Sequence, residues 1–190
     1  MVLPAGVGWL GAAVFAALGG YGVARLVAAA SRPGYPGAHR AVDVAHVLMG
    51  AGMAVMLSPV GGPLPMAAWQ TAFLLVAAWF VGAWAHGLRH PVEPVGWHGS
   101  GLHHALGAVA MLYMLLAVPH PPSAWGPHTG QAAAPLLGWA LVALLAVSSV
   151  PLVRALRCPA GPDLLRCRRT AAGAQLAMSA GMAGMIATLL

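Results

Sequence analysis

Methionine, histidine and glutamine recur at the same spacing in three segments of the chain, and these side chains are its best candidates for chemistry. The strings read His46-x-x-Met49-x-x-x-Met53-x-x-Met56, His104-x-x-Gly107-x-x-x-Met111-x-x-Met114 and Gln175-x-x-Met178-x-x-x-Met182-x-x-Met185. Eight of the nine methionines that follow Met1 fall in these strings, and only Met66 does not. Positions spaced in this way cover about 80° of a helix surface. Each string therefore predicts a single stripe of donor side chains along one helix.

If the three stripes face one another around a common axis, their side chains form layers ~4.5–6 Å apart. From the outer side inward the predicted layers are Met56/Met114/Met185, Met53/Met111/Met182, Met49/Gly107/Met178 and His46/His104/Gln175. Two layers thus hold three thioethers, one holds two, and the innermost holds two imidazoles and an amide. Asp43 lies one turn below His46 at the inner mouth, with His103 nearby.

This set of donors points to copper(I). Thioethers are soft and uncharged, so they select Cu(I) over hard cations. Several similar layers a few ångströms apart let an ion pass from one to the next. The predicted metal ligands are Met49, Met53, Met56, Met111, Met114, Met178, Met182, Met185, His46 and His104. The predicted pathway residues are Asp43, His103 and Gln175. We expect a protein that transports copper, or that holds it and delivers it to a copper-dependent partner protein.

A purely structural interpretation competes with this one. Methionine is a flexible filler of helical cores, and duplication of an ancestral hairpin would align methionines by descent alone. Three stripes in register, each headed by histidine or glutamine, favour metal binding over simple core filling.

The composition of the chain is that of an integral membrane protein. Of the 190 residues, 60% are hydrophobic and 6% are charged, whereas an average globular domain has roughly a quarter charged. The net charge of +6 comes from nine arginines. They form no dense basic run with interleaved aromatic residues, which argues against a nucleic-acid partner. The expected partner is the lipid bilayer, and the expected location is the cell membrane.

Apolar stretches predict an all-α bundle of six transmembrane helices forming a single domain over residues 1–190. The predicted spans are Pro4–Leu26, Ala41–Leu57, Pro65–Leu88, Gly99–Val118, Ala132–Leu156 and Thr170–Leu190. Clusters of proline and glycine end each one. The aligned strings predict three pseudo-repeated helical hairpins, at about residues 1–60, 61–120 and 121–190.

The arginines also predict the orientation of the chain. All nine flank the first, third and fifth connections, and the second and fourth have none. Because arginine is retained on the cytoplasmic side during insertion, we expect both termini outside. Cys158 and Cys167 then fall in the cytoplasmic fifth connection, where we expect ordinary loop cysteines rather than a disulfide.

Two resemblances follow from these motifs. The stacked methionine layers resemble the selectivity filter of Ctr-type copper transporters, in which a Met-x-x-x-Met pair is triplicated by a homotrimer. Met49/Met53 and Met178/Met182 match that pair, whereas Gly107/Met111 does not. This is a likeness of site and not of the whole chain. The six spans with their His–Met strings resemble an actinobacterial membrane family of unknown function, which implies no activity.

Other functions remain open at this level. Nine histidines in a helical bundle are compatible with haem b and electron transfer, with His46 and His104 at one level as axial ligands. That alternative gives no reason for the registered methionines. No Ser/His/Asp, Walker or CxxC signature indicates an enzyme. A structural subunit of a larger assembly is a further alternative.

Overall fold

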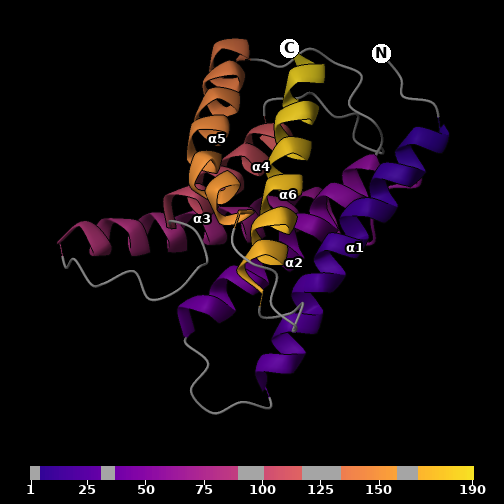
Figure 1. Cartoon of the computed structure of the whole chain (residues 1–190). Coiled ribbons are helices and arrows are strands. Elements are labelled where there is room, and N and C mark those ends of the chain that lie inside the picture. Colours follow the sequence, from indigo (N-terminus) through magenta and orange to yellow (C-terminus); the bar gives the residue numbers. More distant parts are fainter. Residues whose placement is uncertain (1–4, 31–36, 90–100, 117–133, 158–166) are drawn as a thin grey trace.

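Six α-helices make up the described part of the computed structural model, and Figure 1 shows their order along the chain. The structure describes residues 5–30, 37–89, 101–116, 134–157 and 167–190. The helices are α1 (Ala5–Ala30), α2 (Gly37–Leu57), α3 (Met66–Arg89), α4 (Gly101–Leu116), α5 (Pro135–Ala155) and α6 (Arg168–Leu189). No strand occurs in these ranges. The all-α fold with six helices is confirmed.

The observed helices follow the predicted spans closely. The ends differ by a few residues, most at the first connection, where α1 continues to Ala30 and α2 already begins at Gly37. Five helices are long and apolar enough to cross a membrane, and α4, with 16 described residues, is shorter. These lengths and compositions support a multi-pass membrane protein. The predicted breaks at Pro91–Gly96, Pro119–Gly130 and Cys158–Pro162 lie outside the described residues, and so does that at Ser31–Gly37 except for Gly37.

The predicted helix break between α2 and α3 lies within the described residues, and so does the start of α5. In the second connection, Gly61 takes a φ of 74°, a backbone conformation that glycine adopts without steric cost. The backbone N–H of Val60 donates to the hydroxyl of Ser58 at 3.3 Å, which tightens the turn after α2. Proline stands at the start of α5, where its missing N–H has no helical partner to lose.

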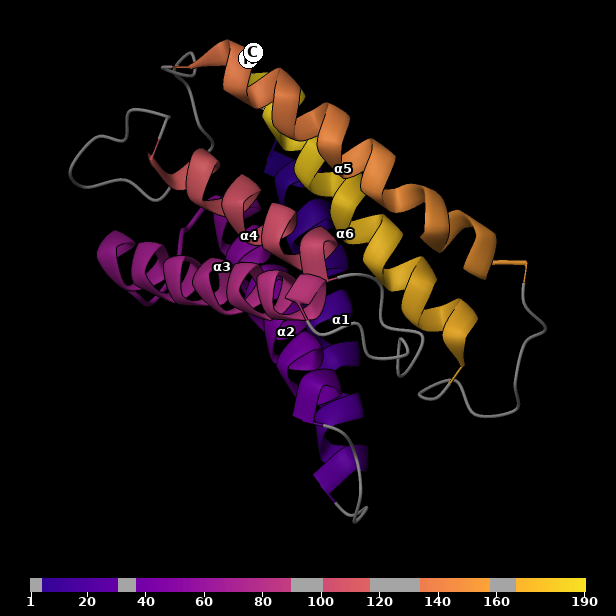
Figure 2. The ribbon, with the colours of Figure 1, turned by 90° about the vertical axis from the view of Figure 1, so that its left-hand side faces the viewer.

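The helices pair as three hairpins in chain order. α1 packs along α2, α3 along α4, and α5 along α6. α2, α4 and α6 also contact one another, whereas α1, α3 and α5 do not touch each other within the described ranges. Contacts between neighbouring hairpins join α2 to α3, α4 to α5 and α6 to α1. Figure 2 shows that the three hairpins run in different directions, so the central helices cross.

Glycine allows the closest approach between two helices. A Cβ atom built on Gly50 of α2 would lie 2.7 Å from the backbone nitrogen of Gly19 in α1 and 2.8 Å from the carbonyl oxygen of Phe15. The two backbones therefore touch, as small residues permit in membrane proteins. This contact fixes α2 against α1 and so sets the position of the first methionine stripe.

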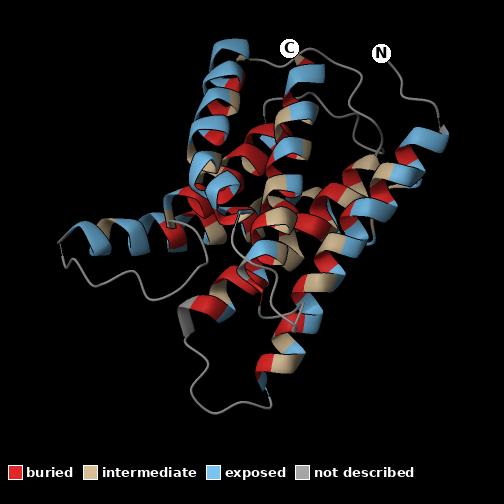
Figure 3. Ribbon diagram, viewed as in Figure 1, coloured by how far each residue is buried: buried red, intermediate tan, exposed pale blue. Residues whose placement is uncertain are grey.

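The core lies where the hairpins meet. Figure 3 shows buried residues at this centre and exposed residues on the outer faces of α3 and α5. Many of the exposed side chains are large and apolar, among them Leu74, Leu75, Trp79, Leu136 and Val147. An apolar outer surface of this kind suits lipid better than water.

Candidate metal centre

The methionine stripes face the interior. Their side chains are buried at Met49, Met53, Met56, Met111, Met114, Met178 and Met182, and half-buried at Met185. They belong to one hydrophobic core that joins α2, α4 and α6. Because these three helices contact one another, the stripes point towards a shared centre and not towards lipid.

Glycines next to the methionines make room for the methyl ends of methionines on other helices. A Cβ built on Gly52 of α2 would lie 2.8 Å from Cε of Met111 in α4, and one built on Gly181 of α6 would lie 3.1 Å from Cε of Met53 in α2. Each thioether thus reaches into the neighbouring stripe. The small residues allow sulfur-bearing side chains from different helices to meet.

Gly107 occupies the position where the repeat lacks a methionine. A Cβ built there would lie 3.3 Å from Cε of Met49, 3.4 Å from its sulfur, and 3.4 Å from Cε of Met182. Methionines from α2 and α6 therefore fill the space that a side chain at Gly107 would take. The sequence predicts only two thioethers at this level, and the methyl end of Met182 from the adjacent layer occupies the third position.

A small cavity opens at this level. Its volume is about 10 Å³, the lower limit for one water molecule. The lining side chains come from α2, α4 and α6: His46, Met49, His103, His104, Gln175, Met178, Ser179 and Met182, with Gly107 as the backbone wall. The structure thus brings the predicted ligands of the two inner layers together around one point.

The innermost layer forms as the aligned strings predict. The rings of His46 and His104 lie edge to face with centroids 5.3 Å apart. The amide of Gln175 donates to Nε2 of His104 at 3.3 Å, which places the ring proton of His104 on Nδ1. Phe80 of α3 stacks on His104 with centroids 5.0 Å apart. Phe80 was not among the predicted site residues, because its contact depends on how α3 lies against α4.

His103 lies beside the cavity, but both of its ring nitrogens are engaged. Nδ1 lies 2.9 Å from the hydroxyl of Ser148 in α5, and Nε2 lies 2.9 Å from the hydroxyl of Ser179 in α6. The hydroxyl oxygens of Ser148 and Ser179 also lie within hydrogen-bonding distance of the carbonyl oxygens of Leu145 and Gln175. Because neutral imidazole donates through one nitrogen and accepts through the other, one serine donates to the ring and the other accepts from it. His103 therefore ties three helices together. To contact an ion in the predicted pathway, His103 would have to give up one of these hydrogen bonds.

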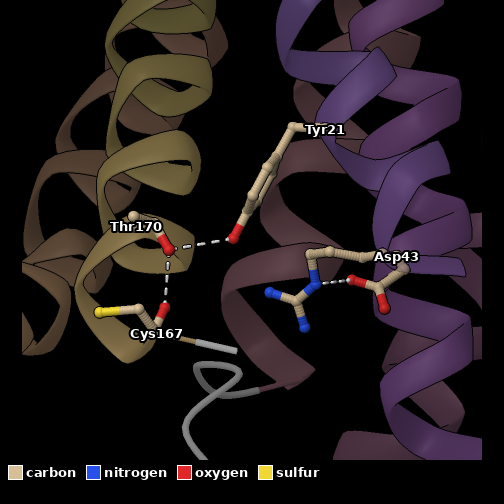
Figure 4. A network of polar contacts seen from close by, with 5 residues as sticks. Tyr21, Asp43, Cys167 and Thr170 are labelled. Atoms are coloured by element: carbon tan, nitrogen blue, oxygen red, sulfur yellow. Dashed lines mark hydrogen bonds and ion pairs between the residues drawn. The ribbon is translucent and has the colours of Figure 1, made fainter. Parts of the chain in front are cut away.

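Asp43 forms an ion pair instead of standing open at the inner mouth. Its Oδ1 lies 3.0 Å from Nε of Arg25, with both side chains almost fully buried. Figure 4 shows this pair beside the hydrogen bond of 3.2 Å between Tyr21 of α1 and Thr170 of α6. Arg25 also lies over the ring of Tyr21, 5.7 Å from its centroid. The position of Arg25 beside the first connection predicts a place at the membrane edge, and its pairing with Asp43 does not follow from the spacing of the two residues.

The described residues contain no group of three or more His, Cys, Asp or Glu side chains that could hold a metal ion. A metal bound among them would therefore need other donors, and the thioethers are the donors that gather at the centre. Sites built from imidazole, thiolate and carboxylate alone are typical of zinc, and the described part of the chain offers none.

Comparison with known proteins gives a family but no activity. Residues 38–189 match the family model described as a domain of unknown function, DUF5134. The chain belongs to the DUF5134 family. No curated protein and no solved structure matches it. The predicted resemblance to a family of unknown function is confirmed, while the actinobacterial origin and the likeness to the Ctr filter stay predictions.

The DUF5134 match spans every residue predicted to bind or guide the metal, from Asp43 to Met185. It begins after α1, so Arg25, the partner of Asp43, lies outside the matched range. Cys167 is buried at the start of α6, and Cys158 lies outside the described residues.

Proposed function

We propose that this DUF5134 protein binds Cu(I) between α2, α4 and α6, and that it moves the ion across the membrane or holds it there. The observation that supports this most is the burial of methionine side chains from three helices at one centre. Met53, Met111 and Met182 each have 2% or less of their surface exposed. They interlock through Gly52, Gly107 and Gly181.

The donor set favours a soft, singly charged ion. Thioether and neutral imidazole carry no charge, so they offset the cost of bringing a divalent cation out of water less well than thiolate or carboxylate does. A monovalent ion such as Cu(I) costs less to desolvate and bonds well to sulfur. The one buried carboxylate described near the inner end, that of Asp43, already faces a guanidinium. The path is therefore close to neutral, which suits loose binding and exchange between layers.

We further infer that the chain consists of three repeated hairpins around a pseudo-threefold axis. The registered strings support this, because no gap is needed to align them. The helix contacts agree: an inner ring of α2, α4 and α6 is surrounded by α1, α3 and α5, and each hairpin touches the next. This arrangement would reproduce within one chain the layered filter that the Ctr-type transporters build from three.

The orientation follows from the arginines. With the first, third and fifth connections in the cytoplasm, Met56, Met114 and Met185 mark the outer end of the path and the histidine layer the inner end. The beginning of α1 and the end of α6 lie towards the same side of the molecule (Figure 1), which supports placing both termini on one side of the membrane; the positions of the arginines make that side the outer one.

Haem b is the alternative that the histidines suggest, and the observed geometry favours it less. Bis-histidine ligation needs two rings on either side of a porphyrin. The rings of His46 and His104 are already in edge contact at 5.3 Å. The cavity beside them has about 10 Å³, far less than a porphyrin needs. Binding of haem would require α2 and α4 to move apart.

A triple substitution of Met53, Met111 and Met182 to leucine tests the proposal. Leucine has nearly the volume of methionine, and such swaps usually cost less than about 1.5 kcal/mol each. We expect the triple variant to keep its helical content and to bind fewer Cu(I) or Ag(I) ions, and to bind them more weakly, in an anaerobic titration. Met66→Leu is the matched control, because Met66 is the one methionine after Met1 outside the stripes. Unchanged metal binding in the triple variant would refute the layered site.

A further inference from the structure

Gly107 creates a cavity at the junction between the thioether layers and the imidazole layer. The gap in the methionine repeat therefore has a structural consequence beyond a missing ligand. Without a side chain at this position, the methyl end of Met182 reaches down from its own layer to within contact of Gly107, beside Met49. The remaining space of about 10 Å³ is near the size of one water molecule. A bare monovalent ion fits in such a space.

The donors around this cavity differ from those of the two complete layers. Thioethers of Met49, Met178 and Met182 line one side, and imidazoles of His46 and His104 line the other. Thioether selects Cu(I), and imidazole suits copper too. His103 borders the same space but its nitrogens are held by serines. Two imidazoles and three thioethers therefore offer more and stronger neutral donors than a triad of thioethers.

We propose that this cavity is the main resting site of the ion, a mixed imidazole–thioether site for Cu(I) or Ag(I), and that the complete methionine triads are passing sites. This inference rests on the proposed function. An ion that comes from the outer layers would bind most tightly where Gly107 opens the cavity, just before the histidine layer. The ion would be held at this cavity after it passes through the methionine triads. One path would then serve both transport and storage of copper.

The amide of Gln175 would act as the positioning residue of this site. It donates to Nε2 of His104, the nitrogen whose lone pair a metal would use. Binding of the ion to His104 therefore requires the amide to turn away or to present its oxygen. Gln175 thus holds the ring at the cavity while no ion is bound to it.

Substitution of Gly107 by alanine tests the site directly. The added methyl group would stand 3.3–3.4 Å from Met49 and Met182, which fills the space for the ion, while alanine favours the helix. We expect the apparent dissociation constant for Ag(I) to rise at least ~10-fold, the scale on which changes around metal ligands act. Gly184→Ala in α6 is the matched control, since no atom lies within 4 Å of a Cβ built there. Unchanged Ag(I) affinity in folded Gly107→Ala protein would overturn the proposal.

X-ray absorption of the unsubstituted protein with one equivalent of Cu(I) decides the question without any variant. We expect both nitrogen and sulfur neighbours around copper, with the multiple scattering typical of imidazole. Copper surrounded by sulfur alone would place the ion in a methionine triad and overturn this inference, while leaving the proposed function intact. A protein that takes up neither Ag(I) nor Cu(I) would refute the proposed function and this inference with it.

Discussion

Nε of Arg25 in α1 lies 3.0 Å from Oδ1 of Asp43 in α2, and the two side chains are only 3% and 0% exposed. The pair joins the first two helices close to the inner end of the proposed path. A carboxylate buried in a membrane protein is costly unless an opposite charge faces it. The guanidinium offsets the charge of Asp43, and the histidine layer one turn away keeps a neutral environment.

Substitution of Asp43 by asparagine should destabilise the protein strongly. It removes the opposite charge from buried Arg25, and breaking a buried pair in this way costs about 3–5 kcal/mol. Thermal or chemical unfolding in detergent measures the loss. The double variant Arg25→Met with Asp43→Leu should recover most of the stability, because it removes both charges. If Asp43→Asn unfolds like the unsubstituted protein but binds less Cu(I), Asp43 is a ligand and the ion pair is secondary.

Replacement of His103 by leucine should lower stability while the bound metal stays the same. Both ring nitrogens bond to serine hydroxyls at 2.9 Å, and leaving the buried hydroxyl of Ser179 without this partner costs about 1–3 kcal/mol. His104→Leu should instead weaken Ag(I) binding, because His104 lines the cavity and is one of the proposed ligands, which would exchange its hydrogen bond with the Gln175 amide for the metal. Parallel unfolding curves and Ag(I) titrations of the two variants distinguish them. Loss of metal from His103→Leu at unchanged stability would contradict the structural role of His103.

Gly50→Ala should separate α1 from α2. The new methyl group would meet backbone atoms of Gly19 and Phe15 at 2.7–2.8 Å, and backbone cannot yield as a flexible side chain can. Overpacking of this kind costs roughly 1–3 kcal/mol. Gly20→Ala is the control, since a Cβ there meets nothing within 4 Å and alanine favours the helix. Equal melting temperatures for the two variants would argue against the close approach of these helices.

The helices could be predicted from the sequence because local signals determine where they begin and end. Runs of apolar residues determine the spans, and the end of α2 before Pro59 and Gly61 falls where the sequence predicts it, whereas α5 begins at Pro135, three residues after the predicted Ala132. The identical spacing of the methionine strings also predicts which faces turn inward, and the burial of Met53, Met111 and Met182 agrees with it.

The partners of the polar side chains could not be predicted in the same way. Ser148 and Ser179 reach His103 from a different hairpin, and no spacing along the chain connects them. The cavity at Gly107 depends on the side chain of Met182, which extends from its own layer towards Gly107. The regular spacing of residues along a helix does not predict the direction of this side chain. The pairing of Arg25 with Asp43 overrides the general expectation that an arginine near a helix end points towards lipid headgroups.

Metal analysis of the purified protein, together with its visible spectrum, tests the central claim most directly. Protein isolated from cells grown with added copper should carry copper at about one ion or more per chain by elemental analysis, with no Soret band. Reduction should leave the copper bound, because the proposed donors prefer Cu(I). A protein that contains no copper and takes up none under reducing conditions would contradict the account. A strong Soret band would replace it with the haem alternative.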